Sequence, residues 1–151
     1  MRTTTPISAS ALLLDRQLCF ALYSSSLAMT KLYKPLLAEL DLTYPQYLVM
    51  LVLWERDGLT VSELGERLYL DSGTLTPLLK RLELAELLTR QRDSADERRV
   101  HVRLTAAGQQ LKSRAEKIPF CVMQASQCSL QEITGLTRQI QKLRNSLIQP
   151  V

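Results

Sequence analysis

The sequence contains three cysteines whose thiols could take part in covalent redox chemistry: Cys19, Cys121 and Cys128. A thiolate is a nucleophile that can attack the O–O bond of a peroxide, which gives a sulfenic acid. A second thiol can then condense with the sulfenic acid to form a disulfide. The alternative interpretation of Cys19 is a small core hydrophobe, since it lies beside Leu18 and one turn from Leu22. A reactive thiol therefore needs neighbours that stabilise its charged form.

The composition argues against several other kinds of site. With one histidine and no Cys-x-x-Cys pair, we expect no metal site, and nothing indicates a cofactor. Three cysteines do not make a structural disulfide framework. No apolar run is long enough to cross a membrane, and the opening Met-Arg-Thr-Thr-Thr-Pro lacks the features of a secretory signal. We therefore expect a cytoplasmic protein.

A second group of residues is suited to nucleic acid. The net charge of +4 and the pI near 9.1 favour an anionic partner. Small hydroxyl residues at the start of a helix, aided by free backbone N–H groups, can approach base edges and phosphates, while cations further along hold the backbone. The candidates on one helical segment are Ser72, Thr74, Thr76, Lys80 and Arg81. The alternative is a structural helix pair with solvated polar residues.

The polar stretch 93–99 is the second candidate for contact with DNA. We expect it to be the protruding loop of a β-hairpin that carries Arg98 and Arg99 at its tip. An arginine there can enter a narrow minor groove, where the negative potential is strongest. Asp96, two residues before Arg98, could brace the guanidinium in a bidentate pair. The alternative is an exposed turn with a surface ion pair.

Helical spacing and capping signals predict the elements that position these side chains. Apolar residues recur every three or four positions over 12–39, which is typical of one long helix, and 45–56 reads as a buried helix. A capping box at Thr60 predicts a short helix to about Leu68. The expected elements after it are a break at 70–73, a helix to about Glu86, strands at 87–92 and 100–104, a helix from Thr105 that Pro119 interrupts, and a last helix from a capping box at Ser129 to about Leu147.

This order predicts a mainly α-helical fold with a small β-hairpin wing. We expect a single domain over 1–151, with a winged helix-turn-helix over 45–104. Terminal helices over 12–42 and 106–148 flank it and carry apolar stripes, such as Leu136 and Ile140, that no other element covers. A chain that cannot bury both ends alone should pair with a twofold mate, so we expect these segments to be dimerisation helices of a homodimer.

The sequence resembles the multiple-antibiotic-resistance regulator family (MarR) over nearly its whole length. The resemblance rests on Leu64 to Leu82, then on Asp96-Glu97-Arg98 and Leu104-Thr105-Ala106-Ala107-Gly108. The segments 15–24 and 33–37, continuing through 42–47, resemble the organic hydroperoxide resistance regulators (OhrR), a peroxide-sensing branch. The resemblance implies a winged-helix homodimer that represses by binding double-stranded operator DNA in its reduced form, with organic hydroperoxides as the signal.

The same resemblance assigns roles to three residues. Cys19 would be the peroxidatic thiol, and Tyr33 and Tyr44 match the two tyrosines that contact the reactive sulfur in the family. Tyr33 is fourteen residues after Cys19, about 21 Å along a straight helix. The two side chains can therefore meet only if the tyrosines come from the other subunit or the helix folds back. We expect a site shared across the dimer interface; the alternative for both tyrosines is interface packing.

The sequence does not single out one resolving thiol, the group that would form a disulfide with the oxidised Cys19. In two-cysteine members of the family a partner lies in the stretch that holds Cys121 and Cys128, but the best-aligned position here is Gln124. We favour Cys121, with Cys128 or a low-molecular-weight thiol as alternatives. Bridging requires Cα atoms within about 7 Å. The terminal helices would have to shift, and with them the spacing of the two DNA-recognition helices.

Three other functions are compatible with parts of the pattern. A repressor of the same fold could respond to a small aromatic ligand, with Cys19 inert. A thiol peroxidase would need a recycling partner and would gain nothing from the arginines of the wing, so we expect no enzyme. A non-specific architectural protein would bind DNA with little regard to sequence, whereas specific regulators prefer their sites by about 10³–10⁷.

Overall fold

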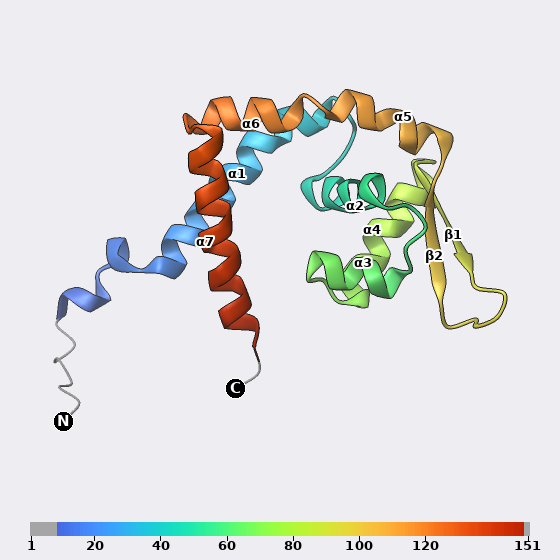
Figure 1. Cartoon of the computed structure of the whole chain (residues 1–151), viewed down its shortest axis with the longest axis horizontal. Helices are drawn as coiled ribbons and strands as arrows, with labels where there is room; N and C mark the ends of the chain where they lie inside the picture. The colour runs from blue at the N-terminus through green and yellow to red at the C-terminus, as the bar shows by residue number, and fades with distance from the viewer. Residues whose placement is uncertain (1–8, 150–151) are drawn as a thin grey trace. The chain divides into compact units, whose positions relative to one another are not determined.

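The computed structural model describes residues 9–149, so the opening hexapeptide considered above lies outside the described residues. The chain divides into two compact units between Tyr44 and Pro45, and each is described by itself. The first unit holds two short 3₁₀ turns, Ala9–Leu12 and Leu14–Arg16, and helix α1, Leu18–Ala38 (Figure 1).

The prediction of one helix from about residue 12 was wrong at its start. The backbone of Gln17 is extended (φ −87°, ψ 116°), so the 3₁₀ turns do not run into α1. The Gln17 side-chain amide donates to the carbonyls of Ala11 (2.6 Å) and Leu13 (3.0 Å), which stabilises this bend. From Leu18 the helix continues through Pro35 to Ala38.

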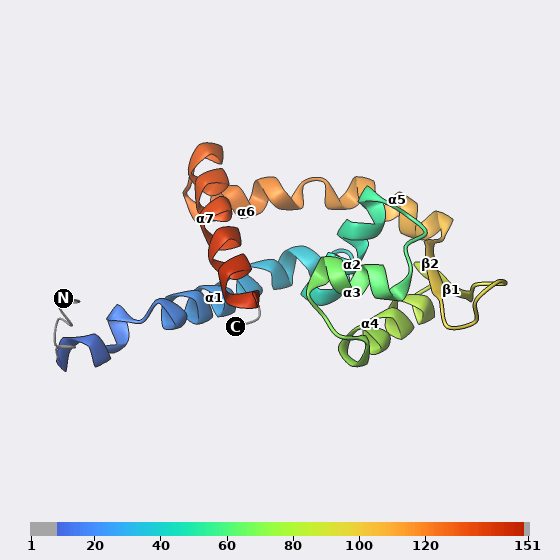
Figure 2. The same ribbon diagram turned by 60° about the horizontal axis from the view of Figure 1, so that its bottom comes forward.

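The second unit contains the remaining elements, with α2 starting at the boundary (Figures 1 and 2). In chain order they are α2 Tyr44–Glu55, α3 Val61–Leu68, α4 Ser72–Leu84, β1 Leu88–Arg92, β2 Val100–Leu104, α5 Ala106–Ala115, α6 Ile118–Ser126 and α7 Leu130–Ile148. This mainly helical fold with one two-stranded hairpin confirms the predicted fold class. In the described part of the chain, no helix combines the length and the hydrophobicity that crossing a bilayer requires.

Short polar side chains cap the helices where the sequence predicted helix starts. The hydroxyl oxygens of Thr60, Thr105 and Ser129 accept the backbone N–H three residues on, at 3.1–3.2 Å. The predicted break at 70–73 was wrong in part, because α4 already begins at Ser72. The carboxylate of Asp71 caps it by accepting the Thr74 N–H at 2.7 Å, and this hydrogen bond holds the pKa of Asp71 below its usual value.

Buried side chains and a close contact at Gly108 fix the base of the hairpin to the helices. Leu88 pairs with Leu104 and Arg92 with Val100, so β1 starts one residue later than predicted. Leu88 and Val102 are fully buried, as are leucines of α3 and α4. At the base of the hairpin, Gly108 lies so close to Leu87 that no larger residue fits, and its carbonyl accepts the Trp54 indole N–H at 2.9 Å. Hairpin, α5 and α2 are thereby held together.

Candidate functional site

Helix α4 presents the two faces that the sequence predicts. Leu75, Leu79 and Leu82 are fully buried, which anchors the helix. The candidate DNA-contacting residues lie on the other side: Ser72, Thr74, Lys80 and Arg81 are exposed and Thr76 is half-buried. The capping hydrogen bond to Asp71 changes one expectation, since the Thr74 N–H is already satisfied and is not available to a phosphate. The Thr76 hydroxyl likewise donates to the Ser72 carbonyl at 2.7 Å.

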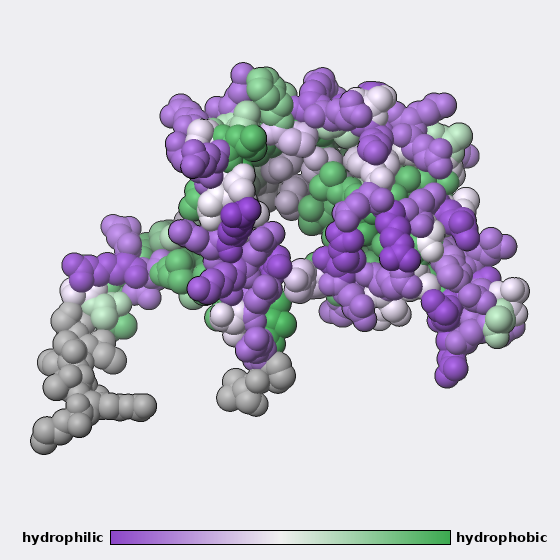
Figure 3. Space-filling model, viewed as in Figure 1, coloured by the Kyte–Doolittle hydropathy of each residue, from purple (hydrophilic) through white to green (hydrophobic). Residues whose placement is uncertain are grey.

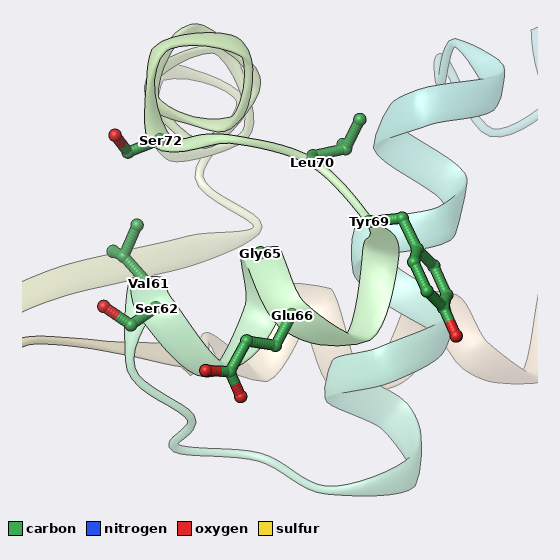
Figure 4. Close-up of a pocket in the computed structure, with 7 residues that line it drawn as sticks. All are labelled: Val61, Ser62, Gly65, Glu66, Tyr69, Leu70 and Ser72. Atoms are coloured by element: carbon green, nitrogen blue, oxygen red, sulfur yellow. The ribbon is translucent and has the colours of Figure 1, made fainter. Parts of the chain in front are cut away.

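A cavity of about 430 Å³ opens beside the start of α4 (Figure 4). Its lining comes from α3, from the turn that joins α3 to α4, and from the first residue of α4: Val61, Ser62, Gly65, Glu66, Tyr69, Leu70 and Ser72. The turn passes close to α3 at Gly65, where a Cβ would meet the Leu70 carbonyl oxygen at 2.8 Å. Tyr69 has a left-handed backbone (φ 58°), and the Arg144 guanidinium of α7 lies 4.4 Å above its ring. Apart from Ser72, the sequence analysis did not select these residues.

The loop between the strands carries the predicted arginine at its surface. The Arg98 side chain is 92% exposed. The bidentate pair expected with Asp96 does not form: a single carboxylate oxygen, Oδ1, accepts both the backbone N–H (3.1 Å) and the Nε–H (3.3 Å) of Arg98. Arg99 turns back toward α3, where it lies 3.8 Å from Glu63. Of the two loop arginines, Arg98 therefore extends further into solvent.

Two polar contacts that the sequence does not reveal hold the hairpin in place. On β1, the Arg90 guanidinium and backbone N–H both reach the Glu83 carboxylate of α4, which lowers the pKa of Glu83. On β2, His101 Nε2 lies 2.8 Å from Asp93 Oδ2. This hydrogen bond is the main cause that lowers the pKa of Asp93 to about 2. Only the strand register brings these residues together, so spacing along the chain gives no sign of them.

The predicted thiol site is divided between an exposed cysteine and a pair of tyrosines. Cys19 lies in the first turn of α1 and is exposed, so the interpretation as a core hydrophobe does not describe it within this chain. Tyr33 and Tyr44 come together, with ring centroids 4.8 Å apart and planes tilted by 51°. Burial raises the pKa of Tyr44, so its phenol keeps its proton and remains a hydrogen-bond donor.

The two other cysteines lie near the junction of α6 and α7. Cys121 is within α6, and Cys128 follows that helix; both are free and half-buried. The Cys128 thiol donates to the Ser126 carbonyl oxygen at 3.4 Å. Among the residues that the structure describes, no three His, Cys, Asp or Glu side chains are grouped so that they could hold a metal ion.

Apolar side chains remain on the surface of the terminal helices. Leu18, Tyr23 and Leu27 on α1 are 50% exposed or more. Helix α7 has no buried residue, and Leu136 and Leu147 on it are 51% and 72% exposed. Hydrophobic side chains reach the surface over α6 and α7 in the space-filling view (Figure 3). Within one chain these helices therefore leave the apolar stripes uncovered.

Comparison with known proteins places the chain among transcriptional regulators. The family model of the SarA/Rot transcriptional regulators matches residues 31–115. An organic hydroperoxide resistance transcriptional regulator of Bacillus subtilis (strain 168) is 51% identical over 136 residues, which cover 90% of this chain and 92% of the relative. The regulator TtmR of Methylorubrum extorquens (strain PA1) is 49% identical over 134 residues, 89% of this chain and 69% of TtmR.

Solved structures give the same fold. Reduced AbfR bound to DNA has a TM-score of 0.74 and 34% identity, covering 91% of this chain and 96% of that one. AbfR, a Staphylococcus epidermidis protein, is also known overoxidised on DNA and in a disulfide form; the disulfide form has a TM-score of 0.61 and 37% identity, covering 86% and 91%. The regulator PcaV of Streptomyces coelicolor with its natural ligand has a TM-score of 0.81 and 26% identity, covering 91% and 98%.

Proposed function

This chain belongs to the MarR family of winged-helix transcriptional regulators, in the branch of the organic hydroperoxide resistance regulators, and from this premise we propose that it is a peroxide-sensing repressor. Its reduced homodimer binds a pseudo-palindromic operator and is released when an organic hydroperoxide oxidises Cys19. The observation that carries the proposal is the contact between Tyr33 and Tyr44, while the exposed Cys19 lies about 21 Å from Tyr33 along the same helix, so that the three cannot meet within one chain.

The DNA-binding part of the proposal uses residues 45–104. The exposed side of α4 enters the major groove, where a helix fits between the phosphate backbones. Ser72, Thr74 and Thr76 lie toward the base edges, and Lys80 and Arg81 hold the phosphates. Arg98 enters the minor groove, with Asp96 and Arg99 supporting the loop. The structures of AbfR on DNA support this assignment by similarity.

The dimer is formed by the terminal helices, residues 12–42 and 106–148. Their exposed apolar stripes support this, because burying them removes a large apolar area from water. Since α1 is continuous from Leu18 to Ala38, Cys19 and Tyr33 are separated by about 21 Å within one chain. Tyr33 and Tyr44 of one subunit therefore reach Cys19 of the other. The phenols stabilise the thiolate by donating hydrogen bonds to it.

The chemistry then proceeds in two steps. The Cys19 thiolate attacks one peroxide oxygen, an S–O bond forms as the O–O bond breaks, and the leaving alkoxide takes a proton to become an alcohol. A second thiol then attacks the sulfenic sulfur, which releases water and leaves a disulfide. We assign this second step to Cys121 of the other subunit, with Cys128 the alternative. The Cys128 S–H already donates to the Ser126 carbonyl oxygen within its own chain.

Operator binding before and after oxidation tests the proposal. Fluorescence anisotropy with a duplex selected by the reduced protein should show release by one equivalent of cumene hydroperoxide. Cys19→Ser should bind the duplex equally well with and without the peroxide. Mass spectrometry should find a Cys19–Cys121 disulfide, and Cys121→Ser should lose it while Cys128→Ser keeps it. Peroxide-induced release of Cys19→Ser would exclude the mechanism.

The wing is tested separately from the thiol. Arg98→Ala should weaken operator binding by roughly 1–3 kcal/mol and leave the rate of Cys19 oxidation unchanged. Glu97→Gln, at the neighbouring position of the same loop, is the control. Operator affinity equal to that of the control would remove Arg98 from the contact with DNA.

One observation favours a second candidate function, release by a small aromatic ligand. An apolar cavity of about 270 Å³ lies between α2 and α5–α6, lined by Tyr47, Leu51, Trp54, Glu55, Lys112, Ala115, Glu116 and Pro119. A related regulator, PcaV, is known with a natural ligand. Release of Cys19→Ser from the operator by salicylate or a similar aromatic acid, without any peroxide, would favour this function over the redox mechanism.

A further inference from the structure

His101 is the single histidine of the chain, and its ring lies between two loops. Nε2 is 2.8 Å from the Asp93 carboxylate, at the start of the loop between the strands. Nδ1 is 3.4 Å from the carbonyl oxygen of Gly58, in the loop between α2 and α3. The side chain is 26% exposed, so the ring is largely enclosed while one edge meets water.

Both partners of the ring are hydrogen-bond acceptors. A carboxylate and a backbone carbonyl have no hydrogen to give, and a neutral imidazole has a single N–H and satisfies one of them. An imidazolium donates from both nitrogens and satisfies both at once. The arrangement therefore suits the doubly protonated ring, and the low pKa of Asp93, about 2, keeps the opposing carboxylate charged at neutral pH.

From Asp93 the hydrogen bonds continue to the tip of the loop. The other carboxylate oxygen of Asp93, Oδ1, accepts the N–H groups of Ala95 (2.8 Å) and Asp96 (3.3 Å). Asp96 Oδ1 in turn accepts the backbone N–H and the Nε–H of Arg98. An uninterrupted series of contacts thus runs from Gly58 through the His101 ring to the Arg98 guanidinium.

We propose that His101 is a positioning residue for DNA binding: its doubly protonated ring fixes the loop so that Arg98 is held where the duplex meets it. The proposal rests on the DNA-binding part of the proposed function and is independent of its thiol chemistry. Operator affinity then increases as the pH falls through the range in which histidines take up a proton. The step adds one proton to the ring and breaks no covalent bond.

Charged groups of both signs surround the ring. The Asp93 carboxylate contacts it directly, and Asp57 lies behind Gly58, where its carboxylate accepts the N–H groups of Gly58 and Leu104. Arg92 and Arg103 line the same shallow cavity as the ring. Toward α3, Glu63 is engaged with Arg99, and toward α4, Glu83 is engaged with Arg90. Of the acidic groups named here, Asp93 is the one in direct contact with the ring.

The experiment measures binding of the reduced full-length protein to the selected duplex from pH 8 to pH 6, at constant ionic strength and with a phosphine reductant. Wild type should bind several-fold more tightly at pH 6. His101→Gln should lose that slope and bind at pH 6 as wild type does at pH 8. His101→Gln combined with Arg98→Ala should be no weaker than Arg98→Ala alone, because the histidine acts through that arginine.

A second measurement keeps the proposal testable without DNA. ¹⁵N NMR of the free protein should find both ring nitrogens of His101 protonated at pH 6, and Asp93→Asn should lower that population. A flat wild-type affinity from pH 8 to pH 6, an equal slope in His101→Gln, or additive losses in the double variant would each overturn the proposal. Absence of sequence-specific binding at any pH, with a normal NMR titration, would instead count against the proposed function.

Discussion

The part of the chain from α2 to α5 and the helices α1 and α7 differ in how many side chains they bury. In the first, α2, α3 and α4 each contain fully buried side chains, and the ion pairs of Arg90 with Glu83 and of Arg99 with Glu63 fix the hairpin to α4 and α3. In the second, α1 has one buried residue, Leu37, and α7 has none in the described part of the chain. The difference teaches that one chain suffices to build the surface proposed for DNA, whereas the proposed thiol site depends on a second.

Two glycines give the strongest contrast between the regions. Gly108→Ala would place a Cβ 2.1 Å from the Leu87 carbonyl oxygen, where the backbone is held by the Trp54 hydrogen bond. We expect a loss of about 3 kcal/mol in the free energy of unfolding, measured by urea denaturation. Gly135→Ala on α7 meets nothing within 4 Å and should stabilise by about 0.5–1 kcal/mol. Similar effects at the two positions would remove the contrast.

A charge on the α7 stripe should separate the subunits without unfolding the rest. Leu136→Asp places a carboxylate on a side chain that is 51% exposed in one chain and buried in the proposed dimer. We expect the dimer to weaken by about 2 kcal/mol, the worth of burying a leucine, as seen by analytical ultracentrifugation. Thr134→Asp, on the opposite side of α7, is the control. An unchanged dimer in Leu136→Asp would place the interface elsewhere.

The caps of α4 and α7 allow the two parts of the molecule to be compared through variants with smaller expected effects on stability. Asp71→Ala removes the cap of α4 and Ser129→Ala the cap of α7, each at a cost of about 1 kcal/mol in thermal or urea unfolding. Because Asp71 directly precedes Ser72, its loss should also weaken operator binding. Ser129→Ala should leave the operator affinity of the dimer unchanged. Equal losses of affinity in both variants would show that the start of α4 has no particular part in binding DNA.

Acid should affect the first region through Asp93. The folded pKa of about 2 lies below the unfolded value of about 3.9, so the carboxylate stabilises the fold above about pH 4, and this contribution is lost as the pH falls toward 2. Urea unfolding at pH 5 and pH 2.5 should show a larger drop for wild type than for Asp93→Asn. Glu97→Gln is the control from the same loop. An equal drop in wild type and Asp93→Asn would contradict the assignment.

Local signals in the sequence predicted most elements. Thr60, Thr105 and Ser129 indicate helix starts because a capping hydroxyl and the N–H that it accepts are only three residues apart in sequence. The three helix starts were confirmed. The early bend was missed because the apolar spacing of a 3₁₀ turn is close to that of an α-helix. Asp71 was missed as a cap because Ser72 and Gly73 after it resemble a break as much as a first turn.

The candidate site could be predicted from the sequence only where all of its residues lie on one secondary-structure element. The two faces of α4 follow from periodicity, and they agree with the observed burial of Leu75 and Leu79. The pairs Arg90–Glu83, Arg99–Glu63 and His101–Asp93 depend on strand register and tertiary packing, which spacing along the chain does not encode. The roles of Cys19, Tyr33, Tyr44 and Cys121 stay predictions, since they concern a partner and an oxidised state.

The contact between Arg144 and Tyr69 joins the last helix, α7, to the turn between α3 and α4, although the two residues are far apart in sequence. The guanidinium of the final helix rests on an aromatic ring two positions before the residue that caps α4. A truncated protein ending before Arg144, made for expression or crystallisation, would leave that ring bare. The turn before α4 would then lack this contact, and DNA affinities measured with the truncated protein would not apply to the intact one. Quantitative DNA-binding experiments should therefore use a chain that includes Arg144.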